Sequence, residues 1–287
     1  MNIQTENKTN EWTTVINPKT GWFDVHPGEL WHYRDLIKLF IHRDFVTFYK
    51  QTILGPLWYI IQPLMNAIVF TIIFGKVAKL PTDGIPPFLF YLSGTVVWGY
   101  FASCLNNTSN TFVANANIFG KVYFPRLTVP VSIVITNIFQ FIIQFTVFLG
   151  FYFYFLLSGA DILPNMRIIA LPLILLQMAV LGLGFGILIS SLTTKYKDLT
   201  FAVGFGVHLW MFITPVVYPL SMIPDRLRPF YILNPMVSVV ESFRSAFLGI
   251  STIEPIHIAI SISVTTLVFI LGVLMFSKVE KTFMDTV

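Results

Sequence analysis

The chain has 287 residues, of which 55% are hydrophobic and 11% are charged. Soluble domains carry roughly 25% charged residues, so this composition excludes a chain that is surrounded mainly by water. We therefore expect an all-α integral membrane protein, whose formal net charge of +4 sets its orientation and does not indicate nucleic-acid binding. Cys104 is the single cysteine, which excludes an intrachain disulfide and a Cys/His metal cluster, so no metal site is expected.

Residues 1–28 form a polar arm, and residues 29–50 have the pattern of an amphipathic helix. Apolar side chains recur at spacings of three and four, from Leu30 to Phe40 and beyond, while charged side chains such as Arg34 fill the opposite side. Such a helix cannot span a membrane, so we expect it to lie in the cytoplasmic headgroup layer, in contact with membrane lipid. The first fifty residues show no signal peptide, which predicts that the amino terminus stays in the cytoplasm.

Residues 51–287 have the composition of a transmembrane domain with six long apolar stretches. About 20 helical residues cross a hydrocarbon core of about 30 Å. The six expected spans lie near residues 57–76, 88–105, 129–157, 168–192, 199–217 and 256–276. Pro63, Pro172 and Pro215 fall inside three of them and predict local kinks. With both termini in the cytoplasm, most of the eighteen Lys and Arg residues lie on the cytoplasmic side, as the positive-inside rule requires.

Segment 221–249, between the fifth and sixth expected spans, is too short and too interrupted to be a seventh. Asn234 is a good N-cap, Pro235 suits the first helical turn and Gly249 is a C-terminal stop, which predicts a helix of about fourteen residues. At 1.5 Å per residue this helix is roughly 21 Å long and cannot cross the membrane. We expect a pair of short re-entrant helices on the external side, covered by protein or by a watery cavity.

Glu241 and Arg244 are three residues apart on one face of this helix, so they can pair with each other or with a second protomer. One interpretation is an ion pair on the helix surface, which would contribute little to stability. The other is a part of a gate at the outer mouth of a transport path.

The sequence offers few residues for chemistry inside the membrane. The expected spans contain His208 and His257, neither of which has a carboxylate at helical spacing, and no H-E-x-x-H or G-x-S-x-G motif occurs. A membrane-embedded enzyme is therefore the weaker class of function. No G-x-x-x-x-G-K-[ST] motif occurs either, so we expect this chain to bind no ATP and no other cofactor by itself. If ATP powers this protein, a partner chain must bind the ATP.

Four parts of the chain point together to one family. They are RDFVTFYKQTILGPLW at 43–58, NIFGKVYFPRLTVP at 117–130, TKYKDLT at 194–200, and TPVVYPLSMIP followed by YILNPM within 214–236. In this order, and on consistent sides of the membrane, they resemble the permease subunit of a type-2 ABC exporter. The resemblance covers residues 30–287 and is strongest to the branch that exports polysaccharides such as O-antigen, capsule or teichoic acid.

The resemblance implies a homodimer bound to two copies of a cytoplasmic ABC ATPase, which holds ATP and Mg²⁺, in the bacterial cytoplasmic (inner) membrane. The complex would move a lipid-linked glycan outward, and this chain would be its non-catalytic membrane subunit. The residues expected to couple it to the ATPase are Arg43, Asp44, Tyr49, Lys121, Tyr123, Phe124, Pro125, Arg126, Tyr196, Lys197 and Asp198. The alternative for the loop at 117–130 is a merely solvated basic loop, and an alternative function is export of a smaller amphiphile such as a drug or lipid.

Aromatic residues near the ends of the first two spans are candidates for the substrate path. These residues are Trp58, Tyr59, Tyr91, Trp98 and Tyr100. Their rings could stack on sugars while their polar tips donate hydrogen bonds, but Trp and Tyr also form belts at the interfaces of any membrane protein. The resemblance places the exit at the re-entrant segment, which makes the external gate candidates Asn234, Pro235, Glu241 and Arg244.

Overall fold

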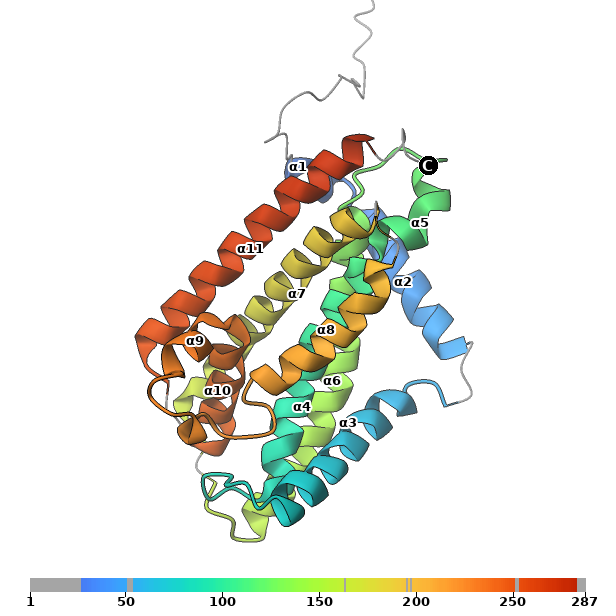
Figure 1. Cartoon of the computed structure of the whole chain (residues 1–287). Coiled ribbons are helices and arrows are strands. Elements are labelled where there is room, and N and C mark those ends of the chain that lie inside the picture. The colour runs from blue at the N-terminus through green and yellow to red at the C-terminus, as the bar shows by residue number, and fades with distance from the viewer. Residues whose placement is uncertain are drawn as a thin grey trace, which may run out of the picture.

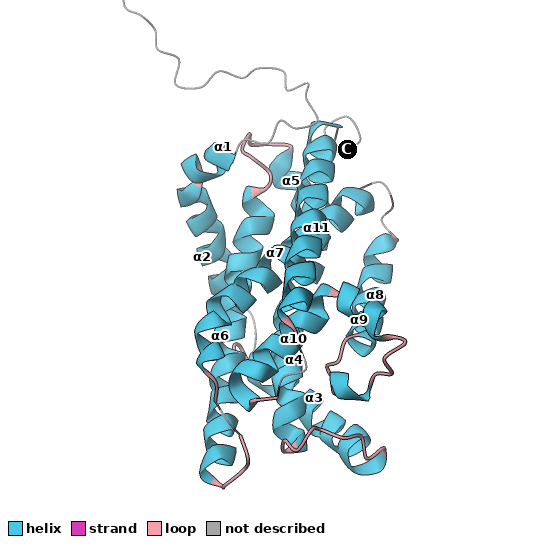
Figure 2. Cartoon of the chain, turned by 90° about the vertical axis from the view of Figure 1, so that its left-hand side faces the viewer, coloured by secondary structure: helices cyan, strands magenta, loops and turns pink. Residues whose placement is uncertain are grey.

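The computed structural model describes residues 27–50, 54–162, 164–194, 196, 198–250 and 253–282. Every regular element in these ranges is helical, as Figure 1 and Figure 2 show. In chain order the elements are α1 (Pro27–His32), α2 (Arg34–Lys50), α3 (Leu57–Phe70), the π-helical η1 (Thr71–Val77), α4 (Pro87–Ser109), α5 (Thr111–Phe119), α6 (Thr128–Leu157), η2 (Met166–Ala170), α7 (Leu171–Thr193), α8 (Leu199–Ile213), η3 (Leu220–Met222), α9 (Arg228–Leu233), α10 (Pro235–Leu248) and α11 (Pro255–Thr282).

Five helices in the described part of the chain are long and apolar enough to cross a membrane. They are Leu57–Val77, Pro87–Ser109, Thr128–Leu157, Met166–Thr193 and Pro255–Glu280. The first joins α3 to η1, and the fourth joins η2 to α7. These helices confirm the positions of five of the six expected spans to within a few residues.

α8 is shorter than the span expected at 199–217. It is a 15-residue apolar helix that ends at Ile213. Thr214 leaves the helix with φ −97° and ψ 143°, because the ring of Pro215 disfavours helical backbone angles in the residue before it. The helix alone is about 22 Å long, so the sixth span stays a prediction.

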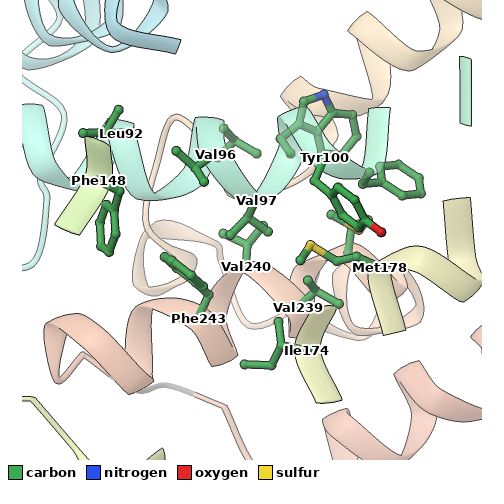
Figure 3. Close-up of a cluster of buried hydrophobic side chains, with 14 of the residues drawn as sticks. Leu92, Val96, Val97, Tyr100, Phe148, Ile174, Met178, Val239, Val240 and Phe243 are labelled. Carbon is green, nitrogen blue, oxygen red and sulfur yellow. The ribbon is translucent and has the colours of Figure 1, made fainter. Parts of the chain in front are cut away.

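α4 is the central helix of the bundle, and it packs against α3, α6, α7, α8 and α10. Its apolar stretch is much more deeply buried than that of any other candidate span. Figure 3 shows part of this core, where Leu92 lies beside Phe148 of α6 and Val97 faces Val240 of α10. The helix that carries three predicted substrate residues, Tyr91, Trp98 and Tyr100, is therefore surrounded by protein on most sides.

Glycines on α7 allow close approach to its neighbours. An added Cβ at Gly186 would lie 1.6 Å from Thr108 Oγ1 of α4, and one at Gly184 would lie 2.9 Å from Phe269 Cα of α11. Lipid tails are as apolar as the side chains, so helices in a membrane associate through such close van der Waals packing. α4, α7 and α11 thus form the tightly packed part of the bundle.

A second buried cluster lies at the end of the bundle that holds α1, α5 and the end of α11, which we call the α5 end (Figure 1). Its members are Phe40, Phe112, Phe119, Phe124, Val129, Ile187 and Phe276. The rings of Phe112 and Phe276 stack with centroids 4.4 Å apart. The amphipathic helix expected at 29–50 is present as α1 and α2, and Phe40 packs it against protein. Its place in the headgroup layer stays a prediction.

α10 has the helix limits predicted for the short segment before the last span. Asn234 caps it by accepting a hydrogen bond from the backbone N–H of Met236 at 3.1 Å, and Pro235 is its first residue. Gly249 ends it in the left-handed conformation, with φ 74°. The 14-residue length is confirmed, and α9 and α10 lie together toward the opposite end of the bundle, the α10 end (Figure 1). Their re-entry into a membrane stays a prediction.

Replacing Gly186 by alanine is expected to lower the melting temperature of the purified protein, because the new methyl group would overlap Thr108. Overpacking of this kind costs about 1–3 kcal/mol. Gly150 of α6 provides the matched control, since an added Cβ there meets no atom within 4 Å. Gly150→Ala should leave the melting temperature unchanged or raise it slightly. Equal melting temperatures for the two variants would contradict the close contact between α4 and α7.

Candidate functional site

A polar cavity of about 400 Å³ lies between α3, α4, α6 and α8, and it is open to the surroundings of the chain, since Gln62, Asn66 and His208 are exposed. All four helices contribute polar side chains: Gln62 and Asn66 of α3, Thr95, Ser103 and Asn106 of α4, Gln140 and Gln144 of α6, and His208 of α8. Amide and hydroxyl groups in an apolar bundle are costly without hydrogen-bond partners, and inside membranes they mark paths for polar substrates. This cavity is the best candidate for a site that receives a polar molecule.

Gln62, Asn66, Gln140 and Gln144 were not predicted as lining residues, although the sequence contains a signal for them. Gln62 and Asn66 are four residues apart on α3, and Gln140 and Gln144 are four apart on α6. Side chains at this spacing share one face of a helix. Two amides on one face of an apolar span therefore indicate a polar lining.

Gln144 shows that the lining can accept further hydrogen bonds. Its Oε1 is buried and has no hydrogen-bond partner among the described residues. Gly99 of α4 lies directly opposite, because an added Cβ there would be 3.3 Å from this oxygen. A buried acceptor without a donor costs about 1–3 kcal/mol, which a bound hydroxyl group would offset.

Only some of the predicted aromatic residues reach this cavity. Trp98 lines it, and its ring centroid lies 6.1 Å from that of Trp210 of α8. Tyr91 and Tyr100 are fully buried in the core and are not part of the lining. The Tyr100 hydroxyl donates a long hydrogen bond, 3.5 Å, to the carbonyl of Val134. Within one chain, Tyr91 and Tyr100 are packed in the core, and their contact with a substrate stays a prediction.

The other two aromatic candidates lie at the start of α3. Trp58 is 51% exposed, which suits either an interfacial belt or contact with another chain. Tyr59 lines a separate cavity of about 260 Å³, together with Asp44 of α2 and Asn137 of α6. Their contact with a substrate stays a prediction.

Arg244 of α10 is the most completely buried large polar side chain in the described core, at 1% exposure. Its Nη1 donates to the carbonyl of Pro215 at 2.6 Å, and its Nη2 donates to the carbonyl of Val216 at 2.8 Å. The pair with Glu241 is confirmed, with 3.3 Å between Nη1 and Oε1. The interpretation of this pair as a surface ion pair is wrong, because Glu241 is also buried, at 4% exposure.

Residues of α4 also contact Arg244. The Nε donates to Ser93 Oγ at 3.4 Å, and the guanidinium carbon lies 3.7 Å from the ring centroid of Phe90. Gly94 makes room for these contacts, since an added Cβ would lie 3.0 Å from Nη2 and 2.9 Å from the Val216 carbonyl oxygen. Arg244 thus joins α10, α4 and the turn that follows α8.

Asn234 also forms hydrogen bonds with the end of α8 and the turn that follows it. Its Oδ1 accepts from the indole N–H of Trp210 at 3.2 Å, in addition to capping α10. Its Nδ2 donates to Thr214 Oγ1 at 3.0 Å. The end of α8 is therefore held twice by α10, once at the cap and once at Arg244.

At the α5 end, several predicted coupling residues are exposed. Lys121 and Tyr123 lie on the loop between α5 and α6, and Tyr123 is 63% exposed. Tyr196 and Asp198 lie between α7 and α8 and are exposed as well. These four side chains are available to a partner at this end.

Other predicted coupling residues fix the loop to the bundle. Phe124 is buried in the second cluster, and Pro125 is half-buried. The backbone N–H of Arg126 donates to Glu280 Oε1 at 3.1 Å, and its guanidinium donates to the Glu280 carbonyl. Burial lowers the pKa of Arg126, and the Glu280 carboxylate opposes that shift, so the side chain stays charged. Arg126 therefore ties the loop to the end of α11.

The remaining coupling candidates lie on α2 or outside the described residues. Arg43 pairs with the adjacent Asp44 at 2.8 Å. Lys197 and the side chain of Tyr49 lie outside the described residues. Within the described ranges, no three His, Cys, Asp or Glu side chains are grouped so that they could hold a metal ion.

Comparison with known proteins gives consistent matches. The model of a family described as ABC-2 type transporter matches residues 35–248. The chain is 28% identical to the O-antigen export system permease protein RfbA of Klebsiella pneumoniae, over 88% of this chain and 94% of that protein. It is 27% identical to RfbA of Myxococcus xanthus, over 83% and 91%. It is 23% identical to the polysialic acid transport protein KpsM of Escherichia coli, over 71% and 78%.

Replacing Arg244 by methionine is expected to destabilise the protein strongly, because the carbonyls of Pro215 and Val216 and the Glu241 carboxylate would stay buried without their donor. Breaking a buried pair in this way costs about 3–5 kcal/mol. Thermal unfolding of the purified chain measures the loss. Arg226→Met, at an exposed loop residue, is the control and should melt like the wild type.

A double charge swap at these positions tests which partner of Arg244 matters more. An arginine at position 241 would lie about 4.5 Å earlier along the helix axis and could not reach the two carbonyls in the same way. The swap is therefore expected to leave the protein as unstable as the single variants. Full recovery would show that the ion pair, and not the carbonyl contacts, carries the stability.

Proposed function

The chain belongs to the ABC-2 type transporter family, and from this we propose that it is the membrane permease of an ATP-driven complex that exports lipid-linked polysaccharide. The observation that carries the proposal is the polar cavity between α3, α4, α6 and α8. The names of the relatives, which refer to O-antigen export and polysialic acid transport, support the substrate class. The chain would act in the bacterial cytoplasmic membrane.

The chemistry of the cavity suits a sugar chain. Among its described lining residues there is no Asp, Glu, Lys or Arg, while amides and hydroxyls are frequent. An amide side chain both donates and accepts, which matches the many hydroxyl groups of a glycan. The ring of Trp98 adds a flat apolar surface on which the C–H face of a sugar can lie.

A second copy of the chain would complete this path. α3 and α8 both border the cavity, and α3, η1 and α8 expose large apolar side chains that do not line it: Leu57, Trp58, Met65, Ile68, Val69, Ile72, Ile73, Phe201, Phe205, Leu209 and Ile213. Polar groups that open toward lipid are costly. Two copies that meet along α3 and α8 would cover the cavity with protein and join two such cavities into one path.

α8 would provide the sixth span together with the residues that follow it. The helix is about 22 Å long, and residues 214–217 follow it as a tight turn. The helix alone is shorter than a hydrocarbon core of about 30 Å, so the span would need both the turn and a locally thinner bilayer. The turn would tolerate membrane depth because Arg244 and Asn234 supply donors to it.

The positive-inside rule supports placing the α5 end in the cytoplasm. There a separate ATPase would contact Lys121, Tyr123 and Tyr196, together with the exposed apolar face of the N-terminal helices that includes Trp31 and Leu39. Phe124 and Arg126 would carry a movement of the loop into α6 and α11. ATP binding by the partner would in this way reach the walls of the path.

At the opposite end, α10 would act as the external gate. It holds the end of α8 at Asn234 and at Arg244, and α8 forms one wall of the cavity. A shift of α8 during transport would therefore have to move α10 or break one of these contacts. The gate residues act from within one protomer in this proposal.

Deleting the gene tests the proposed function in the cell. Surface polysaccharide should disappear and glycan should accumulate inside, and the wild-type gene should restore export. Unchanged surface polysaccharide with lost resistance to amphiphilic drugs would contradict the proposal and favour export of a smaller amphiphile.

In the deletion strain, Gln140→Leu with Gln144→Leu is expected to lower glycan export about tenfold, because two hydrogen-bonding groups are lost from the cavity. Thr146→Val, on the exposed side of α6, should export normally.

Replacing Tyr123 by alanine is expected to reduce ATP-dependent export several-fold while the melting temperature changes little, because a ring that is 63% exposed would contribute mainly to contact with the partner. Arg126→Ala should reduce both export and melting temperature, since it also loses the contacts with Glu280. Val122→Ala, at the exposed neighbouring residue, is the control. Wild-type export by both Tyr123→Ala and Arg126→Ala would show that the coupling assignment is wrong.

A further inference from the structure

A third cavity, of about 610 Å³, lies between the first half of α7, α10 and the first half of α11. Leu173 of α7 and Ile262 of α11 line it and are 69% and 50% exposed, so the cavity is a groove open to the surroundings of the chain. The residues of the polar cavity lie on α3, α4, α6 and α8, and the two linings share no residue. The groove therefore needs a separate explanation.

The walls of the groove are effectively apolar. The hydroxyls of Thr265 and Thr266 donate to carbonyls of their own helix, at Ser261 and Ile262, with distances of 2.8 and 2.9 Å. The amide of Gln177 donates to Ser261 Oγ at 2.6 Å. These polar groups are engaged within the bundle, so the groove presents mainly aliphatic surface.

One end of the groove is charged. Arg167, which precedes α7, is the single charged side chain among the described residues that line the groove. Its Nη1 donates to Ser245 Oγ of α10 at 2.7 Å, and this hydrogen bond holds the guanidinium at this end of the groove. A guanidinium stays protonated and has the planar geometry that binds phosphate oxygens in pairs. The groove thus combines an anion-binding end with an apolar body.

The length of the groove matches one leaflet of a bilayer. Along α7 its lining extends from Ala170 to Val180, which is about 15 Å at 1.5 Å per residue. Half of a hydrocarbon core of about 30 Å is also about 15 Å. Arg167 follows the loop after α6 and is the second residue of the candidate span Met166–Thr193, so it would lie near the lipid headgroups if this helix crosses a bilayer.

We propose that this groove is a binding site for an anionic phospholipid, with the phosphate on Arg167 and one acyl chain along α7 and α11. The occupant is a lipid because the groove opens on the outer side of two candidate spans, which contain α7 and α11, and ends in a cation at the boundary of one of them. In the proposed dimer, the groove stays accessible, since α11 and α3 lie at opposite sides of the bundle (Figure 1). The bound lipid would hold α10 against α7 and α11.

The test uses the full-length chain, purified in mild detergent and incubated with phosphatidylglycerol or with phosphatidylcholine of the same acyl chains. Native mass spectrometry measures the bound lipid. The wild type is expected to retain at least fivefold more phosphatidylglycerol than phosphatidylcholine. Arg167→Gln should remove this preference, whereas Arg226→Gln, an exposed arginine outside the groove, should keep it. Equal retention of both lipids by the wild type, or equal losses in the two arginine variants, would overturn the proposal.

Two further variants separate lipid binding from a role in folding. Ser245→Ala removes the contact with Arg167 but leaves its charge, so the preference for phosphatidylglycerol should persist. Ile262→Trp fills the groove and should lower retention of both lipids about fivefold. Loss of the preference in Ser245→Ala, or full retention in Ile262→Trp, would overturn the site. A change of oligomeric mass in Ile262→Trp with unchanged lipid would point to a second copy as the occupant and would also overturn it.

Discussion

A backbone that leaves its helix at membrane depth must find donors for its carbonyl groups inside the protein, because lipid offers none. The end of α8 meets this constraint through one guanidinium, since Arg244 donates to the carbonyls of both Pro215 and Val216. Glu241 balances the charge of Arg244, and the missing side chain of Gly94 leaves the space for the contact. The short helix α10, the end of α8 and the middle of the bundle all depend on this arrangement. A buried ion pair by itself is a weak source of stability. The contribution of Arg244 therefore lies mainly in its hydrogen bonds to the two carbonyl groups.

Packing is distributed unevenly around the polar cavity. α4 is buried on most sides, and glycines bring α7 close to α4 and α11, so this part of the bundle has little freedom to move. α3 has the least buried apolar stretch of the candidate spans, and α8 exposes much of its surface. The cavity therefore has two firmly packed walls, α4 and α6, and two walls that meet few neighbours within the chain. In a transporter the loosely packed walls are the ones that can shift at low cost, and α10 and the loop at Arg126 contact the bundle at its two ends.

Local signals in the sequence were sufficient for some elements and insufficient for others. The limits of α10 followed from Asn234, Pro235 and Gly249, because capping and helix termination depend on a few adjacent residues. The main partners of Arg244 could not be predicted, since they are backbone carbonyls almost thirty residues earlier in the chain. The burial of Tyr91 was also beyond prediction, because a helix that faces lipid and one that faces protein have the same apolar composition. The amides of the cavity could have been found from their spacing of four residues.

The cavity lining would have a further consequence for a long polymer on the proposed path. Its polar side chains are amides, hydroxyls and one imidazole, and among its described lining residues there is no Asp, Glu, Lys or Arg that would bind one sugar more tightly than the next. An amide can exchange one hydroxyl partner for another of equal strength, which gives a sliding glycan a nearly level energy profile. A lining of this kind cannot distinguish one order of sugars from another. Selection of a particular polymer would then be made before the chain enters, by the lipid that carries it or by the partner that delivers it.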